Sequence, residues 1–201
     1  MSTFDDVQSP ADEERRKLLA RATAAGGLAL AGASLPFVAS LAPSERARAQ
    51  GAPIEVDTAM LKPGELKTVE WRGKPVWILA RTPAMLSRLE SVRSHLTDPD
   101  STVASQQPEY ARNPARAINS ELFVTISLCT HLGCVPTYAP EPGSIEGDWP
   151  GGFYCPCHGS KFDLAGRVYK GSPAPTNLVI PPYQLRGSLL VIGYDATDAP
   201  A

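Results

Sequence analysis

The chain has 201 residues, a net charge of −2 and 43% hydrophobic residues. This length allows one domain of ordinary size together with a tail. Because the small net charge comes without a large basic block, the composition argues against nucleic acid as a partner. The four cysteines favour an oxidising compartment if two of them pair.

The N-terminal residues are polar and are followed by an apolar segment. Residues 1–14 are rich in Asp and Glu and are expected to be unstructured. Residues 22–42 carry no charge, and as a helix they would extend about 31 Å, close to the thickness of a bilayer core. Because Arg15, Arg16 and other basic residues precede this segment, residues 1–21 are expected to stay in the cytoplasm.

Two interpretations of this apolar segment are open. Its small residues suit packing against other helices, which favours an uncleaved transmembrane anchor over residues 22–42. Alternatively, Ala47-Arg48-Ala49 is typical of a cleavage site, and the segment would be a signal removed after Ala49. The twin arginine before it is typical of an export signal for folded proteins. A buried, alanine-rich core helix is disfavoured because charged residues bound the segment sharply.

Residues 43–53 are small, charged and unpatterned, so a linker is expected. It acts either as a flexible hinge or as a passive spacer. From Ile54 onward, short runs of β-branched and aromatic residues are typical of strands. Strands are expected at residues 54–56, 67–71, 76–80, 122–128, 161–163, 167–169, 178–180, 183–186 and 188–194. Tight connections are expected at residues 72–75, at residues 164–166 and at Gly187.

One helix is expected after Thr82, with this residue as the N-cap and Pro83 at the first helical position. Apolar residues then recur at a spacing of three and four, which predicts one buried face. They are Met85, Leu86, Leu89, Val92 and Leu96. His95 has no cysteine or histidine near it in the sequence, so it is expected to be a surface or capping residue. Residues 98–114 are polar and rich in proline, and a surface loop is expected there.

Two short boxes hold all four cysteines and two of the three histidines. They are Cys129-Thr130-His131-Leu132-Gly133-Cys134 and Cys155-Pro156-Cys157-His158-Gly159-Ser160. Each box offers one Cys-His pair at ligand spacing and one further cysteine. Two thiolates and two imidazoles suit either a tetrahedral zinc site or a Rieske [2Fe–2S] centre. Both boxes are dense in Gly and Pro, and each histidine follows its own cysteine, whereas a zinc finger would place both histidines on one helix. The alternative without metal is two plain disulfides.

The two boxes resemble the cluster-binding boxes of the Rieske iron–sulfur subunit of quinol–cytochrome c oxidoreductases, the cytochrome bc1 complexes. The similarity is close over residues 117–183, where Gly171-Ser172-Pro173-Ala174-Pro175 resembles the proline loop of that family. It is loose over residues 54–116. The resemblance implies a mainly β fold. A Rieske-type antiparallel β domain would span residues 54–196, with an inserted cluster-binding subdomain at about 117–183, after one N-terminal transmembrane helix.

The resemblance also implies a ligand set for a [2Fe–2S] cluster. Cys129 and Cys155 would hold the inner iron, and His131 and His158 the outer, solvent-facing iron. Cys134 and Cys157 would form a disulfide between the two loops. Replacing two thiolates by neutral imidazoles raises the reduction potential into a range of roughly −150 to +300 mV.

Two residues near the second box are expected to tune that potential. In the family that the chain resembles, the hydroxyl at Ser160 donates a hydrogen bond to a cluster sulfide, which raises the potential. The alternative is a turn serine that caps its own loop. At Phe162, relatives of high potential have Tyr, whose hydroxyl bonds a cysteine sulfur. Because Phe cannot donate, we expect a lower potential than in those relatives, which leaves the type of quinol open.

The resemblance implies an electron-transfer subunit that takes one electron from quinol, passes it to cytochrome c1 and releases protons to the periplasm. His158 would hydrogen-bond the quinol and accept its proton, while Leu132, Gly133, Pro173 and Pro175 would dock on cytochrome b. The subunit would cross the bacterial inner membrane once, in a dimeric complex, with the Rieske domain on the periplasmic side. Rival functions are the small subunit of an arsenite-oxidase-like enzyme, a soluble Rieske ferredoxin and a zinc-binding module.

Overall fold

A computed structural model describes residues 10–42, 44 and 51–194. The chain divides into two compact units, an N-terminal unit that ends at Arg48 and a second unit that starts at Ala49. Most of the predicted linker, residues 43 and 45–50, lies outside the described residues. Each unit is therefore described by itself.

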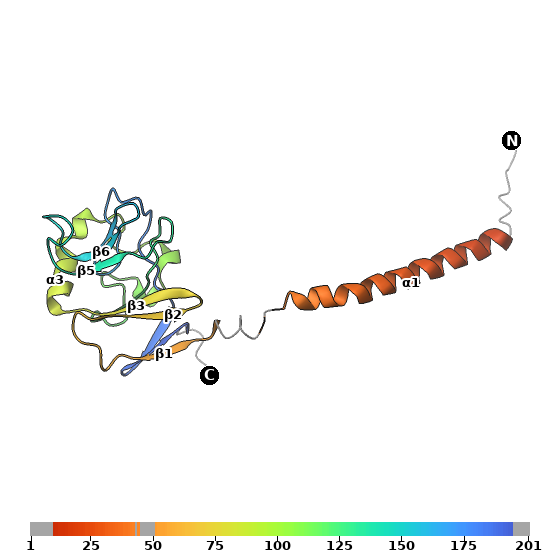
Figure 1. The fold of residues 1–201 in the computed structure, drawn as a ribbon, viewed down its shortest axis with the longest axis horizontal. Coiled ribbons are helices and arrows are strands. Elements are labelled where there is room, and N and C mark those ends of the chain that lie inside the picture. The colour runs from red at the N-terminus through yellow and green to blue at the C-terminus, as the bar shows by residue number, and fades with distance from the viewer. Residues whose placement is uncertain (1–9, 43, 45–50, 195–201) are drawn as a thin grey trace. The chain divides into compact units, whose positions relative to one another are not determined.

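The N-terminal unit contains one long helix, α1 (Pro10–Ser40) (Figure 1). Acidic residues in its first turn suit the partial positive charge of a helix N-terminus, and Glu13 pairs with Lys17 one turn later at 2.7 Å. The expectation that residues 1–14 are unstructured is therefore wrong for residues 10–14, while residues 1–9 lie outside the described residues. From Asp12 to Ser40 the helix is long and apolar enough to cross a membrane.

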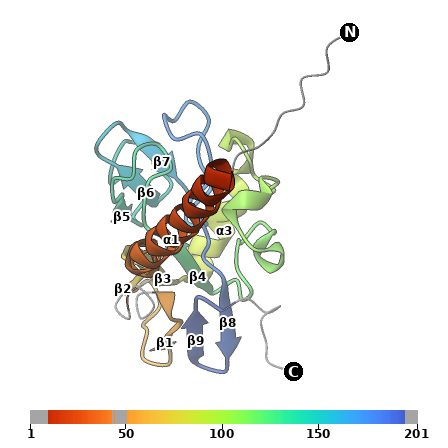
Figure 2. The same ribbon diagram turned by 90° about the vertical axis from the view of Figure 1, so that its right-hand side faces the viewer.

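The second unit is built mainly from antiparallel strands, as predicted, and they form three sheets of three strands (Figures 1 and 2). The first sheet has the order β1 (Ile54–Asp57), β9 (Leu189–Ile192) and β8 (Tyr183–Arg186). The second has the order β2 (Leu66–Trp71), β3 (Lys74–Ala80) and β4 (Leu122–Ile126). The third has the order β5 (Thr137–Ala139), β6 (Gly152–Cys155) and β7 (Ser160–Phe162).

The hairpin of β2 and β3 shows why local sequence predicts these strands well. β2 and β3 pair up to Trp71 opposite Lys74, so only Arg72 and Gly73 form the turn. Both have positive φ, +52° and +69°, which is the geometry of the type I′ turn that favours Gly at its second position. The turn is two residues shorter than predicted because Lys74 and Pro75 belong to β3.

The predicted helix is present as α3 (Pro83–Ser91), and its N-terminal signal is confirmed. The Oγ1 atom of Thr82 accepts a hydrogen bond from the backbone N–H of Met85 at 3.2 Å. The helix ends earlier than the apolar pattern does, and a short 3₁₀ turn (Arg93–His95) follows. Val92 and Leu96 are nevertheless buried, and His95 is exposed as expected.

Three other expectations are corrected. Residues 178–180 are not a strand, because their backbone N–H groups bond different segments: Leu178 donates to Gly166 and Ile180 to Gln106. Residues 167–169 make only isolated bridges. Residues 98–114 are not simply a surface loop, since they contain two 3₁₀ turns (Ala104–Gln106 and Glu109–Ala111) and bury Ser101, Gln107 and Ala111. Strand β5 was not predicted.

An aromatic core joins the second and third sheets. Trp77 on β3 stacks on Phe153 of β6 at 5.0 Å between ring centroids, and Phe123 of β4 lies 6.1 Å from the same ring. The buried cluster that includes these rings also contains Cys129 and Cys155. The core therefore holds the first cysteine of each box in place.

Candidate cluster-binding site

The two boxes form loops with the same local turn. The first follows β4, and the second connects β6 to β7. In the first loop the N–H of Gly133 donates to the carbonyl of Cys129, and in the second the N–H of Gly159 donates to the carbonyl of Cys155, both at 2.9 Å. Both glycines have a φ near +80°, where other residues are strained. Glycine at the fifth position of each box therefore permits the turn.

Two thiols lie side by side at the base of these loops. Cys129 and Cys155 are 3% and 2% exposed and form no disulfide. Burial raises the pKa of the Cys155 thiol, and the neighbouring Cys129 thiol adds to the rise, although the backbone N–H groups of Cys157 and His158 act in the opposite direction. Two adjacent buried thiols suit a positively charged metal centre, which would stabilise their thiolate forms.

Two imidazoles meet on the outer side of the same loops. The ring centroids of His131 and His158 lie 4.7 Å apart, and the rings stand at 88° to one another. His131 is half-buried and His158 is exposed. This donor set, with buried sulfur and outer nitrogen, fits a Rieske centre, which has two Cys ligands on one iron and two His ligands on the other.

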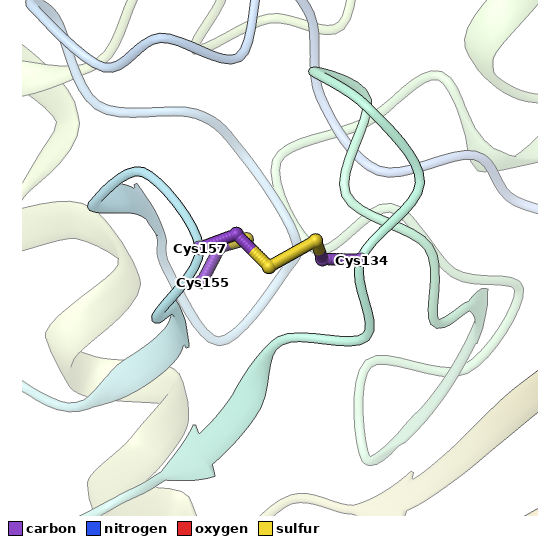
Figure 3. Close-up of side chains that lie close together, drawn as sticks. All are labelled: Cys134, Cys155 and Cys157. Carbon is purple, nitrogen blue, oxygen red and sulfur yellow. A yellow bond between two sulfur atoms is a disulfide. The ribbon is translucent and has the colours of Figure 1, made fainter.

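The structure contains a disulfide between Cys134 and Cys157, which joins the two loops with their Cα atoms 6.7 Å apart. The Sγ atoms of these two residues and of Cys155 all lie within 4.8 Å of one another (Figure 3). Because Cys134 and Cys157 are bonded to each other, only Cys155 of this group is free to bind metal. The disulfide therefore lies directly against one of the candidate ligand atoms.

Residues 171–175, the proline loop, are held by a hydrogen bond from each side. Ala174, which is buried, donates its N–H to the Oγ atom of Ser160 at 3.0 Å. Thr130, inside the first box, donates its hydroxyl to the carbonyl of Thr176 at 2.7 Å. Pro173 and Pro175 are exposed on either side of Ala174. The loop therefore presents its prolines outward beside the two boxes.

Ser160 and Phe162 are both fully buried on β7. The Ser160 oxygen serves Ala174, fourteen residues along the chain, so this serine does not cap its own loop. Its own proton is left for donation, which is compatible with the predicted bond to a sulfide. Phe162 pairs with Phe153 in the β6–β7 ladder. The predicted effects of both residues on the potential stay predictions.

Exposed apolar residues follow His131 in the first box and directly after it. Leu132 is 71% exposed and Val135 is 50% exposed, and Gly133 lies between them at the surface. The sequence predicted a surface role for Leu132 and Gly133, but it did not predict one for Val135 or a supporting role for Thr130 at the proline loop. The one available signal for Thr130 was its position in the sequence, since it places a hydroxyl between the candidate ligands Cys129 and His131.

Comparisons with known proteins agree with this site. A family model described as the Rieske [2Fe-2S] domain matches residues 54–184. The ubiquinol-cytochrome c reductase iron-sulfur subunit of Allochromatium vinosum is 54% identical over 189 residues, 92% of this chain and 91% of that protein. The subunit of the same name from Blastochloris viridis is 42% identical and covers 87% of this chain and 89% of its own length.

A solved structure described as hyperthermophilic respiratory Complex III is 26% identical, with a TM-score of 0.47 and coverage of 86% of this chain and 96% of its own. The family model matches most of the described second unit, and the two relatives align with this chain along almost their whole length. This chain belongs to the family of Rieske [2Fe-2S] iron–sulfur subunits of ubiquinol–cytochrome c reductases.

Proposed function

We propose that the chain is the electron-transfer subunit of a quinol–cytochrome c oxidoreductase, which takes one electron from quinol, passes it to cytochrome c1 and releases protons to the periplasm. One observation carries the proposal. The two boxes meet in a single site with buried thiols beneath and imidazoles outside, and the first box exposes apolar residues next to His131 in the chain.

In this proposal Cys129 and Cys155 hold the inner iron, and His131 and His158 hold the outer iron. A bound [2Fe–2S] cluster with this ligand set supplies a one-electron acceptor of raised potential. The chain supplies the surroundings. Burial of the two thiols keeps water from the sulfur ligands, and the disulfide between Cys134 and Cys157 restrains the loops that carry them.

His158 is the proposed catalytic residue. It is the exposed member of the imidazole pair, so a quinol hydroxyl bound at cytochrome b has access to its outer nitrogen. An imidazole that binds metal through one nitrogen keeps the other for a hydrogen bond, and the positive charge of a bound metal favours transfer of a proton at that nitrogen. The geometry thus suits His158 to orient the quinol and to accept its proton.

The proposed docking surface consists of Leu132, Gly133, Pro173 and Pro175. All four residues are exposed, and they lie in or beside the two boxes. Apolar groups exposed in this number are typical of a contact with another protein. Cytochrome b is the partner in this proposal, and the domain over residues 54–196 would move between it and cytochrome c1 on the linker of residues 43–53.

We further propose that the segment of residues 22–42, which begins in α1 and ends two residues after it, anchors the chain in the inner membrane of a bacterium, as part of a dimeric complex. Residues 1–21, with Arg15 and Arg16, would remain in the cytoplasm, because basic residues favour that side. The Rieske domain would then lie in the periplasm. The boundaries of the cluster-binding subdomain at 117–183, the export signal and the absence of cleavage after Ala49 stay predictions.

An EPR spectrum of dithionite-reduced membranes, recorded with and without an inhibitor of the quinol site, tests the proposal. A Rieske-type signal that the inhibitor shifts is the expected result, because it requires both the histidine-ligated cluster and its docking at a quinol site. A signal that ignores the inhibitor and washes off the membrane contradicts the proposal and favours a soluble or arsenite-oxidase-like role. Absence of any signal contradicts the ligand set and favours zinc.

A further inference from the structure

Among residues 51–194 of the described structure, three arginines are fully buried and only one carboxylate is buried to the same degree. Arg81, Arg116 and Arg167 are 3%, 0% and 0% exposed, and Asp163 is 1% exposed. Arg167 pairs with Asp163 at 2.7 Å. Within residues 10–42, 44 and 51–194, neither Arg81 nor Arg116 forms an ion pair. Buried charges are normally paired, so two unpaired guanidinium groups need an explanation.

Arg81 is satisfied by backbone carbonyls and an aromatic ring. Its Nε donates to Ser120 at 2.8 Å, and its Nη1 donates to Ala115 at 2.9 Å and to Leu164 at 3.2 Å. Its Nη2 atom is buried without a partner among the described residues. Carbonyl dipoles solvate the guanidinium but carry no net charge. The carboxylate that acts on Arg81, Asp163, is already paired with Arg167, so Arg81 has no carboxylate of its own to neutralise it.

Arg116 has the same kind of environment. Its Nη1 donates to the carbonyls of Ala165 and Gly166 at 3.2 and 3.3 Å, and its Nη2 lies 3.1 Å from the amide oxygen of Gln107. The nearest opposing charges are Asp163, already paired with Arg167, and the half-buried Asp98. Burial lowers the pKa of Arg116 to about 9 and that of Arg81 to about 10, so both groups are protonated at neutral pH.

Both arginines bind carbonyls in the turn of residues 164–166, Arg81 that of Leu164 and Arg116 those of Ala165 and Gly166. This turn follows β7 after one intervening residue, Asp163. The guanidinium of Arg81 lies 5.1 Å from the ring centre of Phe123, and this ring lies 6.1 Å from Phe153, two residues before Cys155. Both rings are fully buried. The space between the charge and the candidate ligand is therefore of low polarity, where a charge is screened far less than at the surface.

We propose that Arg81 and Arg116 tune the reduction potential of the cluster through their buried positive charge. Reduction adds one negative charge to the cluster, and an unneutralised cation in the same core stabilises that charge. The effect raises the potential and so opposes the lowering expected from Phe162. The proposal rests on the proposed ligand set, because it needs the cluster to lie at Cys155 and Cys129.

The test compares Met and Lys at both positions in the full chain, in membranes. Arg81→Met and Arg116→Met remove the charge but keep a long side chain, whereas Arg81→Lys and Arg116→Lys keep the charge and lose the planar set of donors. We expect a negative shift of the midpoint potential in each Met variant and a potential near wild type in each Lys variant. Thermal stability should fall in both kinds, because both lose hydrogen bonds. Arg93→Met is the matched control, since Arg93 is a surface residue paired with Asp100. The midpoint potential of the cluster should not change in this variant.

Two results would overturn the inference. One is a wild-type potential in the Met variants with an intact EPR signal. The other is an equal shift in the Lys and Met variants, which indicates a purely structural role.

If the Met variants lose the cluster, the variant Gln107→Glu provides the test instead, because it places a carboxylate beside Arg116 in a side chain of the same shape. A lowered potential supports the inference and an unchanged one overturns it. A wild-type chain without a Rieske signal would contradict the proposed function itself, which separates the two failures.

Discussion

The two box loops share one turn and differ in what they expose. In each, a cysteine carbonyl accepts from a glycine N–H four residues later, and each cysteine is buried. The first loop then presents Leu132 to solvent with 71% of its surface exposed, whereas the second ends at Ser160, which is fully buried. One loop thus exposes an apolar side chain to solvent, and the other directs its last side chain into the core.

The difference follows from how each loop is anchored. The second loop closes a hairpin in which Cys155 pairs directly with Ser160, so both of its ends lie in a sheet. The first loop leaves β4 at Ile126 and next joins a strand at Thr137. Its two ends are joined by one hydrogen bond, from the N–H of Cys129 to the carbonyl of Cys134 at 2.7 Å, but they do not lie in paired strands, and the disulfide and Thr130 restrain the loop further. The same turn therefore serves two purposes.

The largest expected effect comes from removing the feature that both loops share. Cys129→Ser and Cys155→Ser should each abolish the Rieske EPR signal and the bound iron, because a serine hydroxyl is a much poorer ligand than a thiolate. Iron content and EPR of purified membranes provide the measurement. Retention of the signal in one variant would show that the loops are not equal partners. Val135→Ala, also in the first-box region, is the control and should keep the signal.

The disulfide between the loops should have the next largest effect. It links residues 23 apart in sequence, and a chain-entropy model gives such a bond about 3 kcal/mol of stability. Because Cys157 lies against Cys155, Cys134→Ser and Cys157→Ser should also lose the cluster or lower its potential. Urea unfolding and a redox titration of the two variants check this. Normal stability and potential in both would count against the role of the disulfide.

Changing the exposed tip of the first loop should affect catalysis without affecting the centre. Leu132→Ala removes apolar surface worth roughly 1.5 kcal/mol if it is buried on docking, so quinol oxidation should fall by about ten-fold. The midpoint potential should stay the same, because Leu132 touches solvent and not the core. Met60→Ala is a matched control, since Met60 is 85% exposed in the β1–β2 connection. Equal activity in the two variants would place the docking surface elsewhere.

Ser160→Ala is the corresponding change in the second loop and should have the opposite profile. It removes the acceptor for the N–H of Ala174 and the donor available to a sulfide, so the potential should fall and stability should decrease by about 1 kcal/mol. The fully buried side chain makes a direct effect on docking unexpected. A redox titration with a chemical-denaturation curve is the measurement. An unmoved potential would leave Ser160 with a structural role only.

Phe162→Tyr should give the smallest change, a positive shift of the midpoint potential. The new hydroxyl would supply a hydrogen-bond donor near the cysteine sulfur, as the Tyr of high-potential relatives does. Phe162 is fully buried, so the hydroxyl must find a partner to avoid a cost to folding. A potential that is unchanged or lower would sink the idea that this position explains a lower potential.

Much of the fold could be predicted because its signals are local. Thr82 and Pro83 start a helix through one side-chain bond and one fixed dihedral, and Arg72-Gly73 turns a hairpin through two positive φ angles. The same reasoning fails at residues 178–180, where it predicts a strand that the structure does not contain. Their composition is that of a strand, but their hydrogen bonds go to Gly166 and Gln106, segments that no local pattern identifies.

The sequence by itself determined the chemistry of the centre. Spacing within each box predicts one Cys-His ligand pair, and Gly133 and Gly159 permit the turn that carries it, because such turns depend only on short-range backbone geometry. Tertiary structure alone decided that Thr130 supports a loop 46 residues away and that Arg81 bonds a carbonyl 83 residues away. Those contacts depend on how distant segments pack around one shared core, and no local pattern records that packing.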